Sequence, residues 1–197
     1  PGILYWDRIA NYNLLQNTGF EYAGVNPCAE EPLPAGGSCL LGSINLSEFV
    51  VNPFTDQAVI DFVTLAKTVD IAVKALNDVL IEGLALHPLQ EQRDSVNDWR
   101  QIGLGTLGLG DMLIKMGVKY GSPESLRIIE EVYRNIAITA VLSSIKLAKD
   151  KGAFPKCTDG VKRAMYHSDF IQNLQMPDEV RRDIEQYGLA NSQLLTC

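Results

Sequence analysis

Apolar residues recur at helical spacing along two long stretches of the chain. In the first, residues 57–81, positions such as Val69 and Val73 follow a period of about 3.6 residues, which is typical of an amphipathic helix. Thr55 or Asp56 is the predicted N-cap, because both side chains accept hydrogen bonds from the first helical N–H groups. A long helix with one core-facing side is therefore expected here.

The second long helix is predicted to begin at Ser122 and Pro123, because a capping serine followed by proline favours a helix start. It is expected to extend for about 27 residues, to Lys151 and Gly152. Three shorter helices are also predicted: residues 3–15, the apolar segment before Gly117, and the segment from Met176 to Gly188.

The segments between these helices are predicted to be strands or loops. Extended segments are expected at 20–25, 40–51 and 191–197. Proline and glycine oppose regular structure in residues 26–38, and residues 86–99 and 155–176 are predicted to be mostly loop. Long helices that alternate with a few strands favour an α/β fold with a mostly parallel sheet.

Composition narrows the class of protein. The 197 residues fit one domain or slightly more, and 46% hydrophobic with 21% charged residues is ordinary for a soluble chain. Lys and Arg number 17 against 24 Asp and Glu, a net charge of −7 without a basic run, which disfavours binding to DNA. No apolar stretch approaches the roughly 20 residues of a membrane span, and no leader is recognisable. We expect a cytoplasmic protein, cut from a longer one.

The segment from Ile102 to Gly108 matches the G-x-G-x-x-G pattern of dinucleotide-binding loops. That function requires a strand before the glycines and an acidic residue at the end of a second strand about 20 residues later. Residues 97–101 make a poor strand, and Glu124 lies in a helix start. Close packing of helices at Gly103, Gly105 and Gly108 is therefore the preferred interpretation.

Asn26, Cys28 and Glu30 bring an amide, a thiol and a carboxylate to alternate positions of a proline-rich loop. An exposed turn beside a structural cysteine is the simplest interpretation of such a loop. If the three groups serve one small substrate, the backbone must bend at the cysteine, and a loop tip held between two strands would supply that bend. No histidine or lysine stands beside Cys28 to make a thiolate, which leaves one-electron chemistry open to the thiol.

Two motifs resemble the catalytic core of the ribonucleotide reductase large subunit, most closely its adenosylcobalamin-dependent class II branch. They are Asn26-Pro27-Cys28-Ala29-Glu30 and Cys39-Leu40-Leu41-Gly42-Ser43-Ile44-Asn45-Leu46. The glycine-rich segment from Ile102 and the segment from Asn191 to Thr196 are similar to further parts of that family, in the same order along the chain.

The resemblance implies a role for each residue of the loop. Cys28 would become a transient thiyl radical that takes the 3′ hydrogen of the ribose, and Glu30 would accept the proton of the 3′-hydroxyl. Asn26 would hydrogen-bond the substrate hydroxyls, with Pro27 and Ala29 completing the substrate-binding loop. Cys39 would be one half of a redox-active disulfide, and its partner cysteine is expected outside this chain. A thiyl radical also requires a dry, closed pocket.

For the fold, the resemblance implies a fragment of a ten-stranded α/β barrel. Residues 20–51 would form the radical-cysteine loop and residues 55–190 the packing helices, so the fragment alone would be inactive. The implied partners are adenosylcobalamin, a ribonucleotide, a thioredoxin- or glutaredoxin-type reductant, the rest of the reductase chain and, in the complete enzyme, a second copy in a homodimer. Cys157 is interpreted as a surface or packing thiol, and Cys197 is left without a role. No directly bound metal is expected, because the cysteines and histidines lack ligand spacing.

Three alternatives remain open. A class I large subunit would depend on a separate metal-radical subunit, and a gene for that subunit beside the full-length gene would indicate it. A nicotinamide-binding dehydrogenase would bind NADH at the glycines. A non-catalytic helical module predicts that Cys28→Ser leaves turnover of the full-length protein intact.

Overall fold

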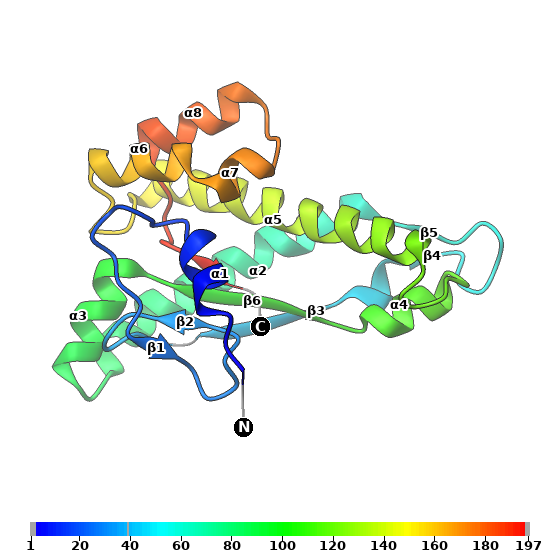
Figure 1. Cartoon of the computed structure of the whole chain (residues 1–197), viewed down its shortest axis with the longest axis horizontal. Coiled ribbons are helices and arrows are strands. Elements are labelled where there is room, and N and C mark those ends of the chain that lie inside the picture. The colour runs from blue at the N-terminus through cyan, green and yellow to red at the C-terminus, as the bar shows by residue number, and fades with distance from the viewer. Residues whose placement is uncertain (1–2, 39, 196–197) are drawn as a thin grey trace.

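The computed structural model describes residues 3–38 and 40–195. A parallel sheet of three strands in the order β3-β6-β7 lies at its centre (Figure 1). The strands are β3 (Leu41–Asn45), β6 (Ile102–Leu107) and β7 (Leu194–Leu195). Leu41 is paired with Gly103, and Ile102 with Leu194. The first four residues of β6 are buried, as expected for a strand covered on both sides. The predicted parallel sheet is thus confirmed.

Two long helices, α2 (Phe62–Gly83) and α5 (Pro123–Lys151), pack along each other beside this sheet. The Ser122 side chain accepts a hydrogen bond from Ser125 N at 3.1 Å, so the predicted start of α5 is confirmed. The predicted start of α2 is wrong, because its N-cap is Asp61, which accepts from Thr64 N at 2.9 Å. Val59 and Ile60, assigned to this helix from their spacing, instead form β5 opposite β4 (Val50–Val51).

The remaining elements surround this centre (Figure 1). They are α1 (Trp6–Asn11), β1 (Gly24–Val25), β2 (Pro32–Leu33), η1 (Leu46–Phe49), η2 (Leu84–Leu86), α3 (Gln90–Trp99), α4 (Leu109–Lys115), α6 (Asp159–His167), α7 (Asp169–Asn173) and α8 (Asp178–Tyr187). The predicted helices before Gly117 and Gly188 are confirmed as α4 and α8. The helix predicted over 3–15 and the strand predicted over 20–25 are shorter than expected.

Three sequence predictions are wrong. Residues 86–99 contain the helix α3, which buries only Val96 and so lacks an apolar period. The segment 155–176 contains α6 and α7, which are capped by the side chains of Thr158 and Ser168. Ile102 to Leu107 is the middle strand of the sheet, whereas packing between helices was expected there. Burial between β3 and β7 outweighs the low strand propensity of its glycines.

Two hydrophobic clusters share α5. The first joins the sheet to α2 and α5 through residues such as Leu65, Val69 and Val132. The second joins the other side of α5 to α6, α7, α8 and the N-terminal segment, with Phe154 and Met165 at its centre. The helix α5 therefore holds the sheet and the C-terminal helices as one body.

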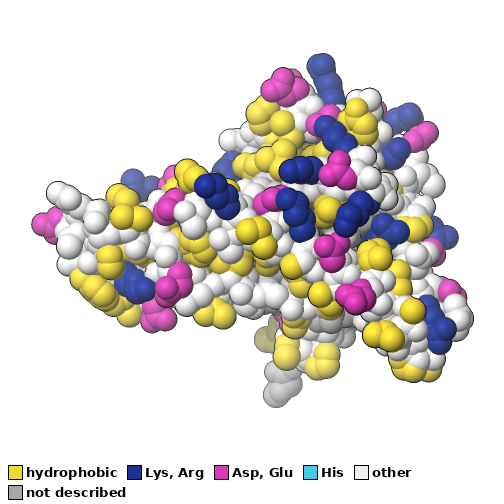
Figure 2. All heavy atoms as spheres, turned by 180° about the vertical axis from the view of Figure 1, so that it is seen from behind, with side chains coloured by type: hydrophobic (Ala, Val, Ile, Leu, Met, Phe, Trp, Pro, Cys, Tyr) yellow, Lys and Arg dark blue, Asp and Glu magenta, His cyan; other side chains and the backbone are white. Residues whose placement is uncertain are grey.

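No helix within residues 3–38 and 40–195 combines the length and the apolar character that a membrane span requires. On the face seen in Figure 2, basic and acidic side chains are interspersed over the surface. This face therefore offers no extended basic patch of the kind that binds nucleic acid backbones.

Candidate functional site

Cys28 lies at the tip of a short β-hairpin. The strands β1 and β2 pair antiparallel, with Gly24 opposite Leu33 and Val25 opposite Pro32, and residues 26–31 connect them. Ala29 N donates to Asn26 O at 2.9 Å, and Ala29 itself has a φ of +65°. The chain therefore bends sharply at the cysteine, as predicted for a loop tip held between two strands.

Asn26 closes the base of this loop. Its N–H donates to Glu31 O at 3.1 Å, and its side-chain Oδ1 accepts from Glu31 N at 3.0 Å. Only 8% of Asn26 is exposed. Asn26 is the residue that the resemblance assigns to the substrate hydroxyls, and its side-chain oxygen already accepts a hydrogen bond within the loop.

The loop tip is exposed within the described part of the chain. Cys28 is a free, exposed cysteine, and Pro27 and Ala29 beside it are also exposed. The dry, closed pocket that the resemblance implies for the complete barrel is therefore not formed by the described residues by themselves. The thiol stands clear of the sheet and is accessible to any group that approaches the hairpin tip.

Glu30 is half-buried, and one of its carboxylate oxygens is shielded from solvent. This oxygen, Oε2, has no hydrogen-bond partner among residues 3–38 and 40–195. A shielded carboxylate oxygen without a donor is energetically costly, and a hydroxyl that donates to it would relieve that cost. The Glu30 carboxylate, two residues from the thiol, is therefore open to a hydrogen bond from a bound molecule.

Glu31 fixes the hairpin to the middle strand of the sheet. It is 1% exposed, and its Oε1 lies where a β-carbon of residue 103 would be, only 1.7 Å from that position. Gly103 N also donates to Leu40 O at 2.8 Å. The strand that follows Cys39 and the hairpin that carries Cys28 therefore meet at Gly103.

Cys39 lies outside the described residues, but its neighbours are placed. Ser38 and Leu40 line a cavity of about 240 Å³ together with Gln101, Leu80 and His87. Gln101 also contacts the hairpin, because its Nε2 donates to Pro32 O at 3.4 Å. Gln101 therefore contacts the hairpin and lines the same cavity as the residues on either side of Cys39.

The glycine motif does not form a phosphate-binding loop. Gly103 and Gly105 lie inside β6, whereas a dinucleotide fingerprint places its glycines in the turn after a strand. Gly108 has a φ of +73°, and a β-carbon there would lie 2.2 Å from Asn45 Oδ1. Asn45 Oδ1 in turn accepts from Ser47 N at 3.2 Å. Gly103 and Gly108 therefore allow close packing, the first within the sheet and the second in the turn that follows it, and not between helices.

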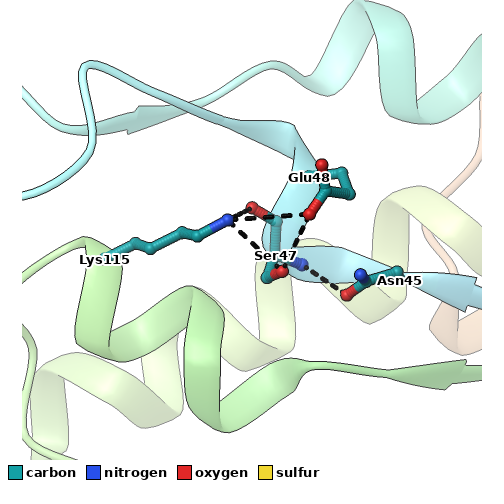
Figure 3. Close-up of polar contacts among 4 residues, drawn as sticks. All are labelled: Asn45, Ser47, Glu48 and Lys115. Carbon is teal, nitrogen blue, oxygen red and sulfur yellow. Dashed lines mark hydrogen bonds and ion pairs between the residues drawn. The ribbon is translucent and has the colours of Figure 1, made fainter.

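A polar cluster lies at the ends of the same strands (Figure 3). Lys115 of α4 donates to Ser47 O at 2.8 Å and lies 3.7 Å from Glu48 Oε1. Its backbone oxygen accepts from Phe54 N at 2.7 Å. This cluster joins α4 to the end of β3 and carries no exposed nucleophile, so it is a structural joint.

The described residues contain no group of three or more His, Cys, Asp or Glu side chains placed to hold a metal ion. Cys157 is 8% exposed, and burial raises the pKa of its thiol. It packs among the C-terminal helices, so of the two predicted alternatives, a surface thiol or a packing thiol, the structure has the packing thiol. Cys197 lies outside the described residues.

Sequence reasoning missed the residues that hold the hairpin: Glu31, Gln101, Tyr22 and Gln193. Gln101 Nε2 donates to Gln193 Oε1, and Gln193 Nε2 donates to the Tyr22 hydroxyl. Their contacts connect positions far apart in the chain, so spacing alone gives no signal. Gln193 was nevertheless within a segment singled out by resemblance.

The ribonucleotide reductase barrel domain model matches residues 1–197. The chain is 39% identical over 155 residues to a vitamin B12-dependent ribonucleoside-diphosphate reductase of Thermoplasma acidophilum, covering 79% of this chain and 19% of that protein. The protein of the same name from Mycobacterium tuberculosis is 34% identical over 159 residues, covering 81% of this chain and 22% of its own length. A ribonucleoside-diphosphate reductase subunit alpha from Chlamydia pneumoniae is 29% identical over 174 residues, covering 80% and 16%.

The chain thus spans about a fifth of the length of these two vitamin B12-dependent relatives. All of the chain's own residues, 1–197, match the family model. The match includes the cysteine hairpin, the glycine-rich strand and the C-terminal strand whose geometry is described above. The chain belongs to the ribonucleotide reductase family, within its barrel domain.

Proposed function

We propose that the full-length protein reduces ribonucleotides to 2′-deoxyribonucleotides and that Cys28 is the thiol that starts the reaction. The observation that carries this proposal is the hairpin tip, where an exposed free thiol stands two residues from a carboxylate with a shielded, unpartnered oxygen. Family membership supports it, because the relatives are named ribonucleoside-diphosphate reductases.

In this account the Cys28 thiyl radical removes the hydrogen atom from C3′ of the ribose and becomes a thiol. Glu30 takes the proton of the 3′-hydroxyl, and the 2′-hydroxyl leaves as water after it has taken a proton from a thiol of the reducing dithiol. Glu30 returns its proton to the 3′-oxygen when the sugar has been reduced. An S–H bond is weak enough to exchange hydrogen with C–H, and a carboxylate takes a proton without competing for the radical. The same thiol returns the hydrogen atom to C3′ at the end of the turnover.

The two electrons that reduce the sugar come from a dithiol, which is left as a disulfide. We infer that Cys39 is one of these thiols, because Ser38 and Leu40 lead into the strand that meets the hairpin at Gly103. Its partner is expected in another part of the full-length protein. A thioredoxin- or glutaredoxin-type reductant would then restore the dithiol.

The radical source that we propose is adenosylcobalamin. Two relatives are named vitamin B12-dependent, and the accessible Cys28 thiol suits hydrogen transfer to an external group. When bound, this cofactor supplies a carbon radical that oxidises a thiol. Within residues 3–38 and 40–195, Cys28 alone is assigned to receive that radical, and residues that bind the cofactor are expected elsewhere.

We further propose that these residues are part of a ten-stranded α/β barrel, with residues 20–51 as the radical-cysteine loop and 55–190 as the packing helices. β3 and β7 are the outer strands of the described sheet, so both offer an edge for additional strands. Closure of the barrel around the exposed hairpin tip would supply the dry pocket that the radical requires. The complete enzyme is expected to be a homodimer.

The test is reduction of a ribonucleoside diphosphate by the full-length protein with a dithiol reductant, in the presence and absence of adenosylcobalamin. The proposal predicts turnover only with the cofactor and none in Cys28→Ser. Turnover without cobalamin that requires a second, metal-containing subunit would replace the class II assignment by class I. Turnover by Cys28→Ser would overturn the role of the thiol.

A further inference from the structure

The hairpin that carries Cys28 has little support of its own. Its strands β1 and β2 contain two residues each and form a separate two-stranded sheet. A two-stranded hairpin is marginally stable in water unless it packs against other elements. The position of its tip therefore depends on the side chains that attach it to the central sheet.

Two buried glutamines provide such an attachment. Gln101 immediately precedes β6 and Gln193 immediately precedes β7, and they are 5% and 3% exposed. Gln101 Nε2 donates to Gln193 Oε1 and also to Pro32 O in β2, the latter at 3.4 Å. Both N–H groups of the Gln101 amide are thus directed to defined acceptors.

The second glutamine contacts the segment that leads into the other strand of the hairpin, β1. Gln193 Nε2 donates to the Tyr22 hydroxyl and to Asn13 Oδ1, the latter at 3.2 Å, while the Tyr22 hydroxyl lies 3.2 Å from the same Asn13 oxygen. Tyr22 precedes Ala23, whose N–H donates to Leu33 O at 2.8 Å. The two glutamines therefore hold the hairpin on both sides, at β2 and at the segment that precedes β1.

We propose that Gln101 and Gln193 are positioning residues that set the place of Cys28 relative to the sheet. This inference extends the proposed function, since it assumes that the place of Cys28 matters for turnover. Gln101 and Gln193 are 92 positions apart in the chain and immediately precede two neighbouring parallel strands. A hairpin attached at one side alone would tilt about that side, whereas attachment at β2 and at the segment before β1 fixes the tip.

The test uses the full-length protein with Gln101→Met and Gln193→Met, which remove the amides but keep nearly the same side-chain volume. Amide hydrogen exchange of the peptide covering 23–33 is expected to be at least about tenfold faster in both variants, with α5 unchanged. Ser143→Ala is the matched control, because it removes a partly buried hydrogen bond of 2.7 Å to Asp70 that joins α5 to α2 and not to the hairpin. Hairpin exchange at the wild-type rate in both variants would overturn the proposal.

Kinetics separate positioning from general destabilisation. If the glutamines position Cys28, both methionine variants lose kcat by at least about tenfold, while KM for the nucleotide stays within about threefold of the wild-type value. Ser143→Ala should not combine a loss of kcat with an unchanged KM. If a methionine variant fails to fold, Tyr22→Phe is the milder variant. Where Gln193→Met does fold, the effects of Tyr22→Phe and Gln193→Met on hairpin exchange must be non-additive, because the two side chains share one hydrogen bond. Equal loss of kcat in the control, or additive effects, would contradict the proposal.

The outcome for the glutamines is distinguishable from that for the proposed function. If Cys28→Ser retains turnover, the proposed function fails, and the exchange rates still decide whether the glutamines hold the hairpin. If Cys28 is required but hairpin exchange is unaffected by the glutamine variants, the glutamine proposal alone fails.

Discussion

The Glu31 carboxylate occupies the space beside Gly103 that a side chain would otherwise fill. A β-carbon at residue 103 would lie 1.7 Å from Glu31 Oε1 and 2.7 Å from Leu41 Cδ2. The first glycine of the G-x-G-x-x-G pattern is therefore required by the attachment of the cysteine hairpin to the sheet. Gly103 allows the Glu31 side chain to approach the backbone of β6 closely, and it does not form a phosphate-binding turn.

Gly103→Ala is expected to displace Glu31 and to lower the free energy of unfolding by about 1 to 3 kcal/mol, the range for overpacking of a filled interior. It should also lower turnover, because Glu31 and Asn26 together close the loop of Cys28. Denaturant titration and turnover of the full-length protein measure both effects. Gly110→Ala is the control, since a β-carbon at residue 110 meets nothing within 4 Å. Equal behaviour of the two variants would contradict this account.

Local signals explain which parts of the fold could be predicted. Ser122 and Pro123 define the start of α5 by hydrogen bonding within one turn, and the prediction was confirmed. The helix α3 was missed because Val96 is its only buried residue. The strand β6 was missed because its state depends on β3 and β7, which are distant in sequence. The same distance concealed Gln101 and Gln193, whereas the bend at Cys28 follows from a local motif.

Tyr22 is predicted to keep its proton well beyond the usual range. Burial raises the pKa of its hydroxyl from 10.0 to about 12, and the hydrogen bond from Gln193 offsets part of that rise. Below pH 10 the folded and unfolded states both hold the proton, so the stability has no dependence on this group. Between pH 10 and about 12 only the folded state holds it. Stability must therefore fall in this window, by about 1.4 kcal/mol per pH unit.

The difference in tyrosinate absorbance between the wild-type protein and Tyr22→Phe isolates this titration. Its midpoint is expected near pH 12. Tyr120→Phe is the control, because Tyr120 is 67% exposed. A midpoint near pH 10 for Tyr22 would mean that its hydroxyl is solvated and not buried.

Lys115 is predicted to stabilise the joint between α4 and the end of β3. Its ammonium donates to Ser47 O at 2.8 Å, and its side chain is 27% exposed. Lys115→Met should lower the free energy of unfolding by about 1 to 2 kcal/mol, because a charged donor is lost and a carbonyl oxygen is left without it. Thermal denaturation compared with that of the wild-type protein measures the change.

Lys151→Met is the matched control for Lys115. Lys151 pairs with Asp78 at 2.9 Å, but the two side chains are 59% and 60% exposed. Exposed ion pairs contribute about 0 to 1 kcal/mol, so this variant should differ little from the wild type. A larger loss in Lys151→Met than in Lys115→Met would show that the cluster in Figure 3 is not a joint.

The most direct test of the central claim compares Cys28→Ser with Cys157→Ser in the full-length protein, using a ribonucleotide deuterated at C3′. Cys28 is exposed at the hairpin tip, and Cys157 is buried among the C-terminal helices. If Cys28 removes the 3′ hydrogen, the wild type and Cys157→Ser will turn over with a deuterium isotope effect, and Cys28→Ser will form no deoxyribonucleotide. Product formation by Cys28→Ser with the same isotope effect would contradict the account.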